Sequence, residues 1–172
     1  PIRRQAGVSA QALAVARDFP DVWNNRALTL KDMKRLVEAL ASVERALALH
    51  PGFAEAHNNL GITLNNLGRQ EESEVSLRRA ITIKPEFAEA HNNLGNTLKE
   101  LGRLEESEES FRKAIAIKPE YAEAHNNLGV ILKEIGRLEE AQACCKKALT
   151  FKPEYAEAHN NLGSTLHELG RL

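Results

Sequence analysis

Apolar side chains recur along this chain at alternating steps of three and four residues, the spacing of one helix face. In residues 88–101 this stripe includes Leu94 and Leu98, and a glycine follows it. A second stripe in residues 104–117 includes Phe111 and ends before a proline. Glycine is the usual residue just past a helix end, and proline interrupts a helix. The pattern therefore predicts two helices joined by a tight turn.

The same pattern returns with a fixed period. The octapeptide Ala-Glu-Ala-His-Asn-Asn-Leu-Gly occurs unchanged at residues 54–61, 88–95, 122–129 and 156–163, and each copy begins 34 residues after the one before. A period of about 20–50 residues is the signature of a repeat array, in which each unit covers the apolar face of its neighbour. The chain is therefore predicted to be all-α, a stack of two-helix units.

The period makes residues 1–172 a single array. Its predicted parts are a leading helix at 1–19 that matches the second helix of a preceding repeat, a degenerate unit at 20–53, units at 54–87, 88–121 and 122–155, and the first helix of a truncated or capping repeat at 156–172.

The degenerate unit departs from the pattern at two positions. Arg26 stands where the other units have leucine, and Lys34 stands where they have the turn glycine. We expect this turn to shift or to hold a strained residue, at a cost of about 1 kcal/mol. A charged residue at an otherwise apolar position suits a terminal, solvent-facing unit.

The residues at fixed offsets resemble the tetratricopeptide repeat family. That family's pattern is an aromatic, Leu-Gly, a large residue, a small residue, an aromatic, alanine and proline, which here fall on His91, Leu94, Gly95, Leu98, Ser107, Phe111, Ala114 and Pro119. The resemblance covers residues 20–172. It implies a right-handed α-solenoid, or superhelix, whose first helices line a concave groove that holds peptides.

The candidate binding residues lie on the side of the first helices opposite the leucines. An asparagine pair recurs there once per unit, at Asn24 and Asn25, Asn58 and Asn59, Asn92 and Asn93, Asn126 and Asn127, and Asn160 and Asn161. An amide both donates and accepts, as a peptide backbone does, so such a ladder can bind main chain. One asparagine of each pair also resembles the ladder in the repeats of peptide O-linked N-acetylglucosamine transferases. The alternative is that one asparagine per pair only bonds a neighbouring loop.

Charged and further polar residues share this face. They are Glu89, Asn96, Lys99, Glu123 and Lys133. Such mixed charge argues against a uniformly acidic or basic ligand. The related carboxylate clamp, in which similar repeats hold chaperone tails, needs a cationic cluster. The corresponding positions here carry Leu28, Ile62 and Val130, so that mode is disfavoured.

The histidines, cysteines and glutamate pairs could suggest metal binding, redox chemistry or catalysis, but each has a structural explanation. One histidine per unit cannot share a zinc ion, because stacked helices lie about 8–10 Å apart and zinc needs ligands at about 2 Å. Cys145 takes the core position of Phe111, although Cys144 beside it invites a redox role. Three glutamate pairs lie at the start of predicted second helices, where negative charge is favourable. They are Glu71 and Glu72, Glu105 and Glu106, and Glu139 and Glu140. We predict no catalytic residues, no metal and no cofactor, and expect that the chain is not an enzyme.

Composition removes other classes of function. The formal net charge is −1, so no global field attracts nucleic acid. No apolar run is long enough to span a membrane. The cysteines form one adjacent pair and the chain lacks an Asn-x-Ser/Thr sequon, which fits a reducing, cytoplasmic, bacterial-type protein. The start at Pro1 is that expected of a fragment whose targeting signal is not observable.

We therefore expect a non-catalytic scaffold that binds an extended peptide or partner helix in a concave groove. Its predicted partner is a protein or peptide, not a nucleic acid or a membrane. Leu162, Leu166 and Leu169 form an uncovered stripe on the last helix, which indicates further repeats or self-association into a homo-oligomer through the terminal helices. The alternative is a substrate-recruiting region of a larger glycosyltransferase or sulfotransferase.

Overall fold

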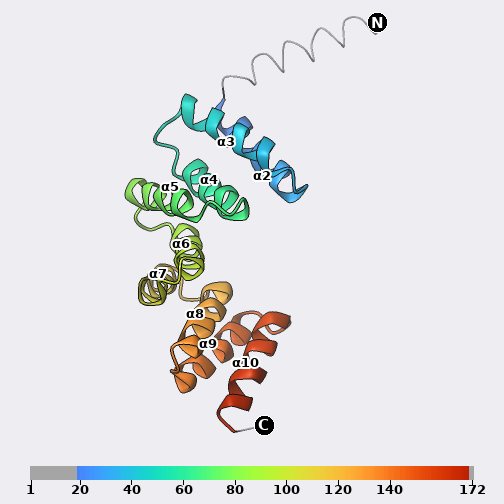
Figure 1. Cartoon of the computed structure of the whole chain (residues 1–172), viewed down its shortest axis with the longest axis vertical. Coiled ribbons are helices and arrows are strands. Elements are labelled where there is room, and N and C mark those ends of the chain that lie inside the picture. The colour runs from blue at the N-terminus through green and yellow to red at the C-terminus, as the bar shows by residue number, and fades with distance from the viewer. Residues whose placement is uncertain (1–18, 171–172) are drawn as a thin grey trace, which may run out of the picture. The chain divides into compact units, whose positions relative to one another are not determined.

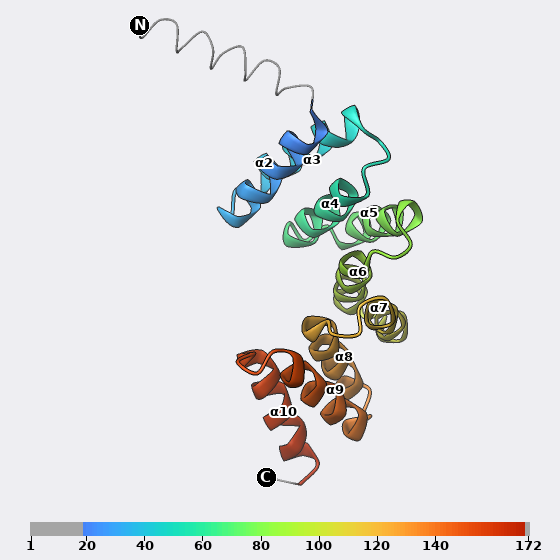
Figure 2. The same cartoon turned by 180° about the vertical axis from the view of Figure 1, so that it is seen from behind.

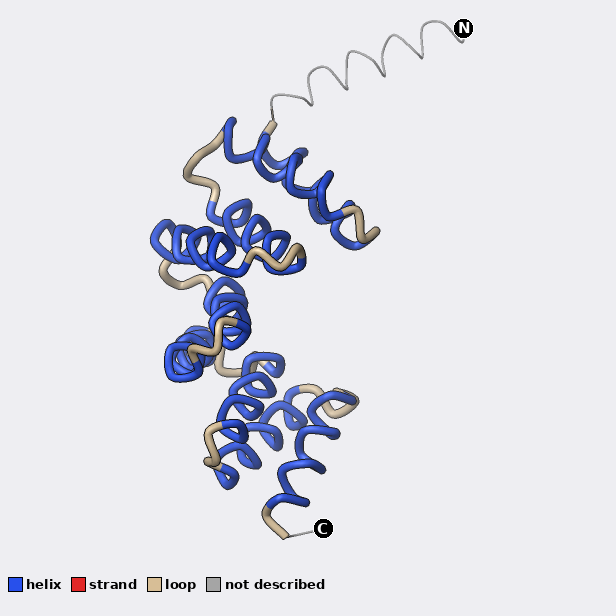
Figure 3. The backbone as a smooth tube through the Cα atoms, in the orientation of Figure 1, coloured by secondary structure: helices blue, strands red, loops and turns tan. Residues whose placement is uncertain are grey.

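The computed structural model describes residues 19–170, and within them every regular element is an α-helix (Figure 3). The helices are paired as hairpins along the chain (Figure 1). The predicted all-α class of stacked antiparallel helix pairs is thus confirmed. The leading helix predicted for residues 1–19 lies outside the described residues, apart from Phe19.

The chain divides into two compact units, Pro1–Lys84 and Pro85–Leu172. The described part of the first unit contains α2 (Pro20–Asp32), α3 (Leu36–Leu49), α4 (Ala54–Asn66) and α5 (Gln70–Ile83). Helix α2 pairs with α3 and α4 with α5, and α3 packs against α4. Val43 and Ala56 are fully buried in the core of this unit, and Trp23 packs against them.

The second unit continues the same alternation (Figure 2). It contains α6 (Ala88–Glu100), α7 (Leu104–Ile117), α8 (Ala122–Glu134), α9 (Leu138–Phe151) and α10 (Ala156–Glu168). Helices α6 and α7 form one hairpin, α8 and α9 the next, and α10 packs against α9. The fully buried Phe111 lies at the centre of its core, with Leu128, Ile131 and Leu132 around it. Helix spacing agrees with a repeat of about 34 residues, while the predicted unit boundaries stay a prediction.

Close approach in the hairpins α4/α5, α6/α7 and α8/α9 depends on glycine in the first helix. A Cβ atom added at Gly95 would lie 2.6 Å from Cε1 of Phe111. One added at Gly61 would lie 2.5 Å from Cγ of Leu77. The Ser107 hydroxyl donates to the Gly95 carbonyl over 2.7 Å, which fixes the same contact. Small residues therefore let the two helices of a pair touch, as the sequence indicated.

Each first helix ends in a left-handed residue. This is glycine at Gly68, Gly102, Gly136 and Gly170, with φ between 65° and 80°, and Lys34 in the degenerate unit, with φ 61°. The amide of Arg35 donates to the carbonyl of Leu30 over 2.9 Å, so the closing bond of the turn is kept. The expectation that this turn holds a strained residue is confirmed.

We expect Lys34→Gly to raise the free energy of unfolding by about 1 kcal/mol, because glycine adopts positive φ without a Cβ clash. Urea denaturation followed by circular dichroism measures the change. Lys34→Ala is the control, since it removes the charge but keeps the Cβ atom. Equal stabilisation by both variants would show that charge, not backbone conformation, limits this turn.

Candidate functional site

The asparagine pairs lie in the first halves of α2, α4, α6, α8 and α10. We call the side of each first helix that carries its pair the asparagine face. The first member of the pair is buried at four of its five positions, namely Asn24, Asn58, Asn92 and Asn126, and exposed at Asn160. The second member is exposed at Asn25, buried at Asn59 and partly buried at Asn93, Asn127 and Asn161.

Hydrogen bonds join the pairs of successive first helices. In the first unit Asn59 Nδ2 donates to Asn24 Oδ1 over 2.7 Å. In the second unit Asn127 Nδ2 donates to Asn92 Oδ1 over 3.1 Å. The second member of one pair thus bonds the first member of the pair before it.

The same hydrogen bond between asparagine side chains recurs between α8 and α10. Asn161 Nδ2 donates to Asn126 Oδ1 over 2.9 Å, and Asn126 is only 3% exposed. The partner is therefore an asparagine of the neighbouring first helix rather than a loop. The first members accept bonds within the stack, and the second members Asn93 and Asn127 are partly buried.

Charged side chains surround the asparagine face of the second unit. Asn92 Nδ2 donates to Glu123 Oε1 over 3.0 Å, and Lys118 Nζ lies 3.4 Å from Glu89 Oε1. Lys133 Nζ donates to Ser164 over 2.9 Å. These contacts hold carboxylates at the start of the helices and an ammonium group near their end.

Other predicted residues of this face are accessible in different degrees. Asn96 and Lys99 are partly buried on α6, and Val130 is partly buried on α8. Tyr155 precedes α10 and donates to Glu157 Oε2 over 3.1 Å. Burial, and then Glu157, raise the pKa of Tyr155 to about 12, so its hydroxyl stays a donor near neutral pH.

The histidine of each octapeptide is a structural donor. His125 Nε2 donates to the carbonyl oxygen of Pro119 over 2.8 Å, and its ring stacks on Phe151 with centroids 5.6 Å apart. His91 bonds Pro85 in the same way over 3.0 Å. Among residues 19–170 no group of His, Cys, Asp and Glu side chains is arranged to hold a metal ion.

Burial lowers the pKa of His91 and His125, although their bonds to proline carbonyls act in the opposite direction. A nearby lysine, Lys113 for His91 and Lys147 for His125, adds to the lowering. The folded state therefore binds fewer protons than the unfolded state below the ordinary histidine pKa of about 6.5. Stability contributed by the neutral rings is complete above that pH and is lost as pH falls through the folded pKa.

We accordingly expect the melting temperature to fall between pH 7.5 and pH 5.5, before carboxylates titrate. The variant H91Q/H125Q should show a flatter profile, because glutamine cannot protonate. The control is H57Q, since His57 makes the same bond to Pro51 but is not among the buried rings. An unchanged slope in the double variant would contradict the assignment.

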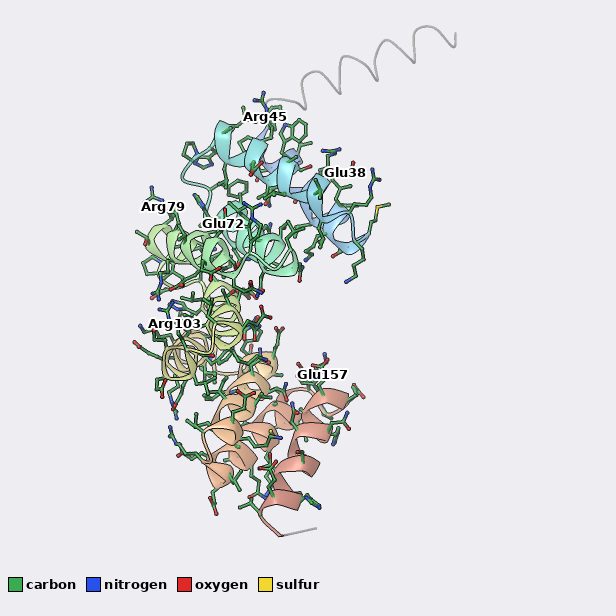
Figure 4. The ribbon with its side chains drawn as sticks, viewed as in Figure 1. Glu38, Arg45, Glu72, Arg79, Arg103 and Glu157 are labelled. Carbon is green, nitrogen blue, oxygen red and sulfur yellow. The ribbon has the colours of Figure 1, made fainter. Side chains whose placement is uncertain are left out.

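Cys145 is buried and Cys144 partly buried, and each glutamate pair has an arginine partner. Cys144 and Cys145 are free thiols, and burial raises the pKa of both, that of Cys145 to about 11. In each of three second helices, one glutamate of the pair instead binds an arginine three residues before it. Figure 4 labels Glu72 at the start of α5 and Arg103 before α7, members of two of these pairs.

The sequence interpretation missed this arginine-glutamate pairing, although its signal is plain. Arg35 and Glu38, Arg69 and Glu72, Arg103 and Glu106, and Arg137 and Glu140 recur every 34 residues, each at 2.6–2.7 Å. Exposed pairs of this kind contribute little individually. Arg137 also bonds Glu108 of the preceding second helix over 2.8 Å, so it links two hairpins.

The predicted self-association stripe is only partly open. Leu162, Leu166 and Leu169 of the last helical segment are partly buried. Leu128 and Leu132, the counterparts of the first two in α8, are 3% and 0% exposed. In the described chain no helix is both long and apolar enough to cross a membrane.

Family models of tetratricopeptide repeats match most of the chain. The described matches are to a TPR repeat at residues 63–102 and 95–136, and to tetratricopeptide repeats at residues 20–53, 43–75 and 122–155. Together they extend from residue 20 to residue 155 and include no catalytic family. Comparison with curated protein sequences gives no match.

Solved structures share the fold. PilW, a type IV pilus biogenesis factor, has a TM-score of 0.82 at 29% identity, over 88% of this chain and 70% of that one. YrrB, described as a TPR protein with an unusual peptide-binding site, has 0.72 at 22%, over 94% and 84%. The first TPR of Spaghetti (RPAP3), bound to the HSP90 peptide SRMEEVD, has 0.66 at 20%, over 68% and 93%.

Proposed function

This chain belongs to the tetratricopeptide repeat family, and from that premise we propose that it is a non-catalytic scaffold that binds an extended peptide or a partner helix. The observation that supports the proposal best is the row of partly buried asparagines Asn93, Asn127 and Asn161 on successive first helices of the second unit. Their amides lie beside carboxylates at one end of the helices and Lys133 further along. The peptide-binding site named in the description of YrrB and the HSP90 peptide bound to Spaghetti support the same use of the fold.

The ligand differs in charge from an acidic chaperone tail. SRMEEVD ends in a run of carboxylates, which requires several cations. The asparagine face of the second unit offers Lys99 and Lys133, with Glu89 and Glu123 on the same helices. We infer main-chain recognition by amides rather than capture of a carboxylate cluster. The same face would serve a longer protein in which the chain recruits substrates to a catalytic domain.

A peptide-display screen on the whole chain tests the proposal, followed by fluorescence polarisation with a labelled hit. V130R places a long charged side chain on the asparagine face, and we expect it to weaken binding at least tenfold. E139Q is the control, because Glu139 is exposed at the start of α9. Failure to find any peptide that distinguishes V130R from E139Q would refute binding at this face.

We also propose that copies of this chain associate through the last helix, because its leucines are less buried than Leu128 and Leu132. Light scattering coupled to size exclusion compares the wild type with a variant carrying polar residues at Leu162, Leu166 and Leu169. A mass of one 19.1 kDa chain at all concentrations would remove this part of the proposal.

The free cysteines suit a reducing compartment, so we propose that the scaffold is cytoplasmic.

A further inference from the structure

A cavity of about 360 Å³ lies in the first unit, and none of the paired asparagines lines it. Its lining comes from α3, α4 and α5: Glu44, Leu60, Leu64, Arg69, Glu71, Glu72, Val75 and Ser76. We call it the α3/α5 cavity, because these two second helices flank it and α4 supplies the leucines. Val75, one of these lining residues, is 70% exposed.

Residues in and near the cavity differ from their counterparts in the second unit. Positions in α3, α4 and α5 correspond to positions 68 residues later in α7, α8 and α9. Phe111 there becomes Val43 here, and a smaller side chain fills less space. Leu128 is 3% exposed, whereas its counterpart Leu60 is only partly buried. Leu60 is thus an apolar side chain of the lining that is less covered than its counterpart in the second unit.

Two charge changes keep the rim of the cavity open. In the second unit Arg112 lies 3.5 Å from Glu140, and Arg137 bonds Glu108 over 2.8 Å, so long side chains cross from α7 to α9. In the first unit Glu44 replaces Arg112 and Leu40 replaces Glu108. The counterpart of the Arg112–Glu140 pair cannot form, because Glu44 and Glu72 have the same charge. The counterpart of the Arg137–Glu108 pair cannot form, because Leu40 is uncharged.

The rim is acidic. Arg69 is bound to Glu72 through two bonds of 2.6 Å and 2.7 Å and is also near enough to Glu44 to be affected by its charge, so one arginine faces three carboxylates. Glu44 and Glu71 remain, both exposed. An apolar floor between Leu60 and Leu64 with an acidic rim is complementary to an apolar side chain that has a lysine or arginine next to it.

We propose that the α3/α5 cavity is a second docking site of this scaffold, which receives one large apolar side chain of a partner protein flanked by basic residues. It is independent of the asparagine face, so one chain can hold two partners or two segments of one partner. The occupant is a peptide segment, because an apolar side chain between basic neighbours matches an apolar floor between acidic groups.

The test uses three short capped peptides with the central sequences Lys-Phe-Lys, Glu-Phe-Glu and Lys-Ala-Lys. Methyl spectra of the intact chain report on Leu60, Leu64 and Val75 during titration. We expect Lys-Phe-Lys alone to shift these methyl signals, with a dissociation constant of about 0.1–1 mM that weakens in high salt. No shift at millimolar peptide, or equal shifts with all three peptides, would overturn the proposal.

Two variants separate the charges from the apolar wall. E44R restores the arginine of the second unit and is expected to bridge to Glu72, so Lys-Phe-Lys binding should fall at least fivefold. V75E introduces the residue that the next repeat has at this position, Glu109. It adds a negative charge, which alone would favour the basic peptide, but it removes an apolar contact, so we expect Lys-Phe-Lys binding to weaken. The control E139R makes the same charge change as E44R on α9 and should leave binding unchanged. Binding that survives in both E44R and V75E would place the peptide elsewhere.

Discussion

Replacing Phe111 by alanine is expected to lower the free energy of unfolding by about 3–5 kcal/mol, the range for large aromatic side chains removed from a packed core. The ring is fully buried and contacts Leu128, Ile131 and Leu132 of the next hairpin, so it belongs to two units of the array at once. Alanine would leave a cavity between α7 and α8 that the rigid helices cannot close. Urea denaturation followed by circular dichroism gives the change.

The matched control is F151A. Phe151 is 46% exposed at the end of α9 and stacks on His125, so the same deletion removes much less buried surface. We expect a loss of about 1 kcal/mol. Repeat arrays can unfold in parts, so amide exchange in α7 and α8 should accompany the denaturation curve. Equal losses in both variants would contradict the assignment of Phe111 to the centre of the core.

Features that depend on a few neighbouring residues could be predicted from the sequence, as the degenerate unit shows. The turn at Lys34 could be foreseen, because its requirement for a left-handed residue is local to a few positions and the other units place glycine there. The helix pairs could be foreseen for the same reason, since each 34-residue period contains both the apolar periodicity of the helices and the glycine and proline that end them.

Burial of the asparagines could not be derived in this way. A helical wheel places Asn126 opposite the leucines and therefore toward solvent, yet its side chain is 3% exposed and accepts a bond from Asn161. A wheel describes one helix, whereas this side chain lies beside the next first helix as well. The distance between neighbouring first helices, which decides whether two amides meet, is a property of the stack.

The α3/α5 cavity combines both kinds of information. The sequence shows that Val43 is smaller than Phe111 and that Glu44 has the opposite charge to Arg112. Whether neighbouring side chains close the resulting space depends on packing that no single position reveals. Only the arrangement of α3, α4 and α5 shows that Leu60 stays partly uncovered.

The octapeptide copies offer an internal experiment, because the same glycine has different neighbours in different units. We expect G95A to destabilise the chain by about 1–3 kcal/mol, since the added Cβ atom would lie 2.6 Å from the buried ring of Phe111. In this chain G163A meets nothing within 4 Å and should instead stabilise α10 by up to about 1 kcal/mol, the gain in helix propensity.

Changes of opposite sign in the free energy of unfolding, at two glycines of the same octapeptide, would show that packing and not helix propensity requires a small residue at Gly95. The double variant G95A/F111A makes the argument quantitative, because removal of the ring removes the clash. We expect G95A to cost almost nothing in the F111A background, which gives a coupling energy of about 1–3 kcal/mol. Additive losses in the double variant would mean that the two residues do not compete for the same space, and the contact between α6 and α7 would need a different explanation.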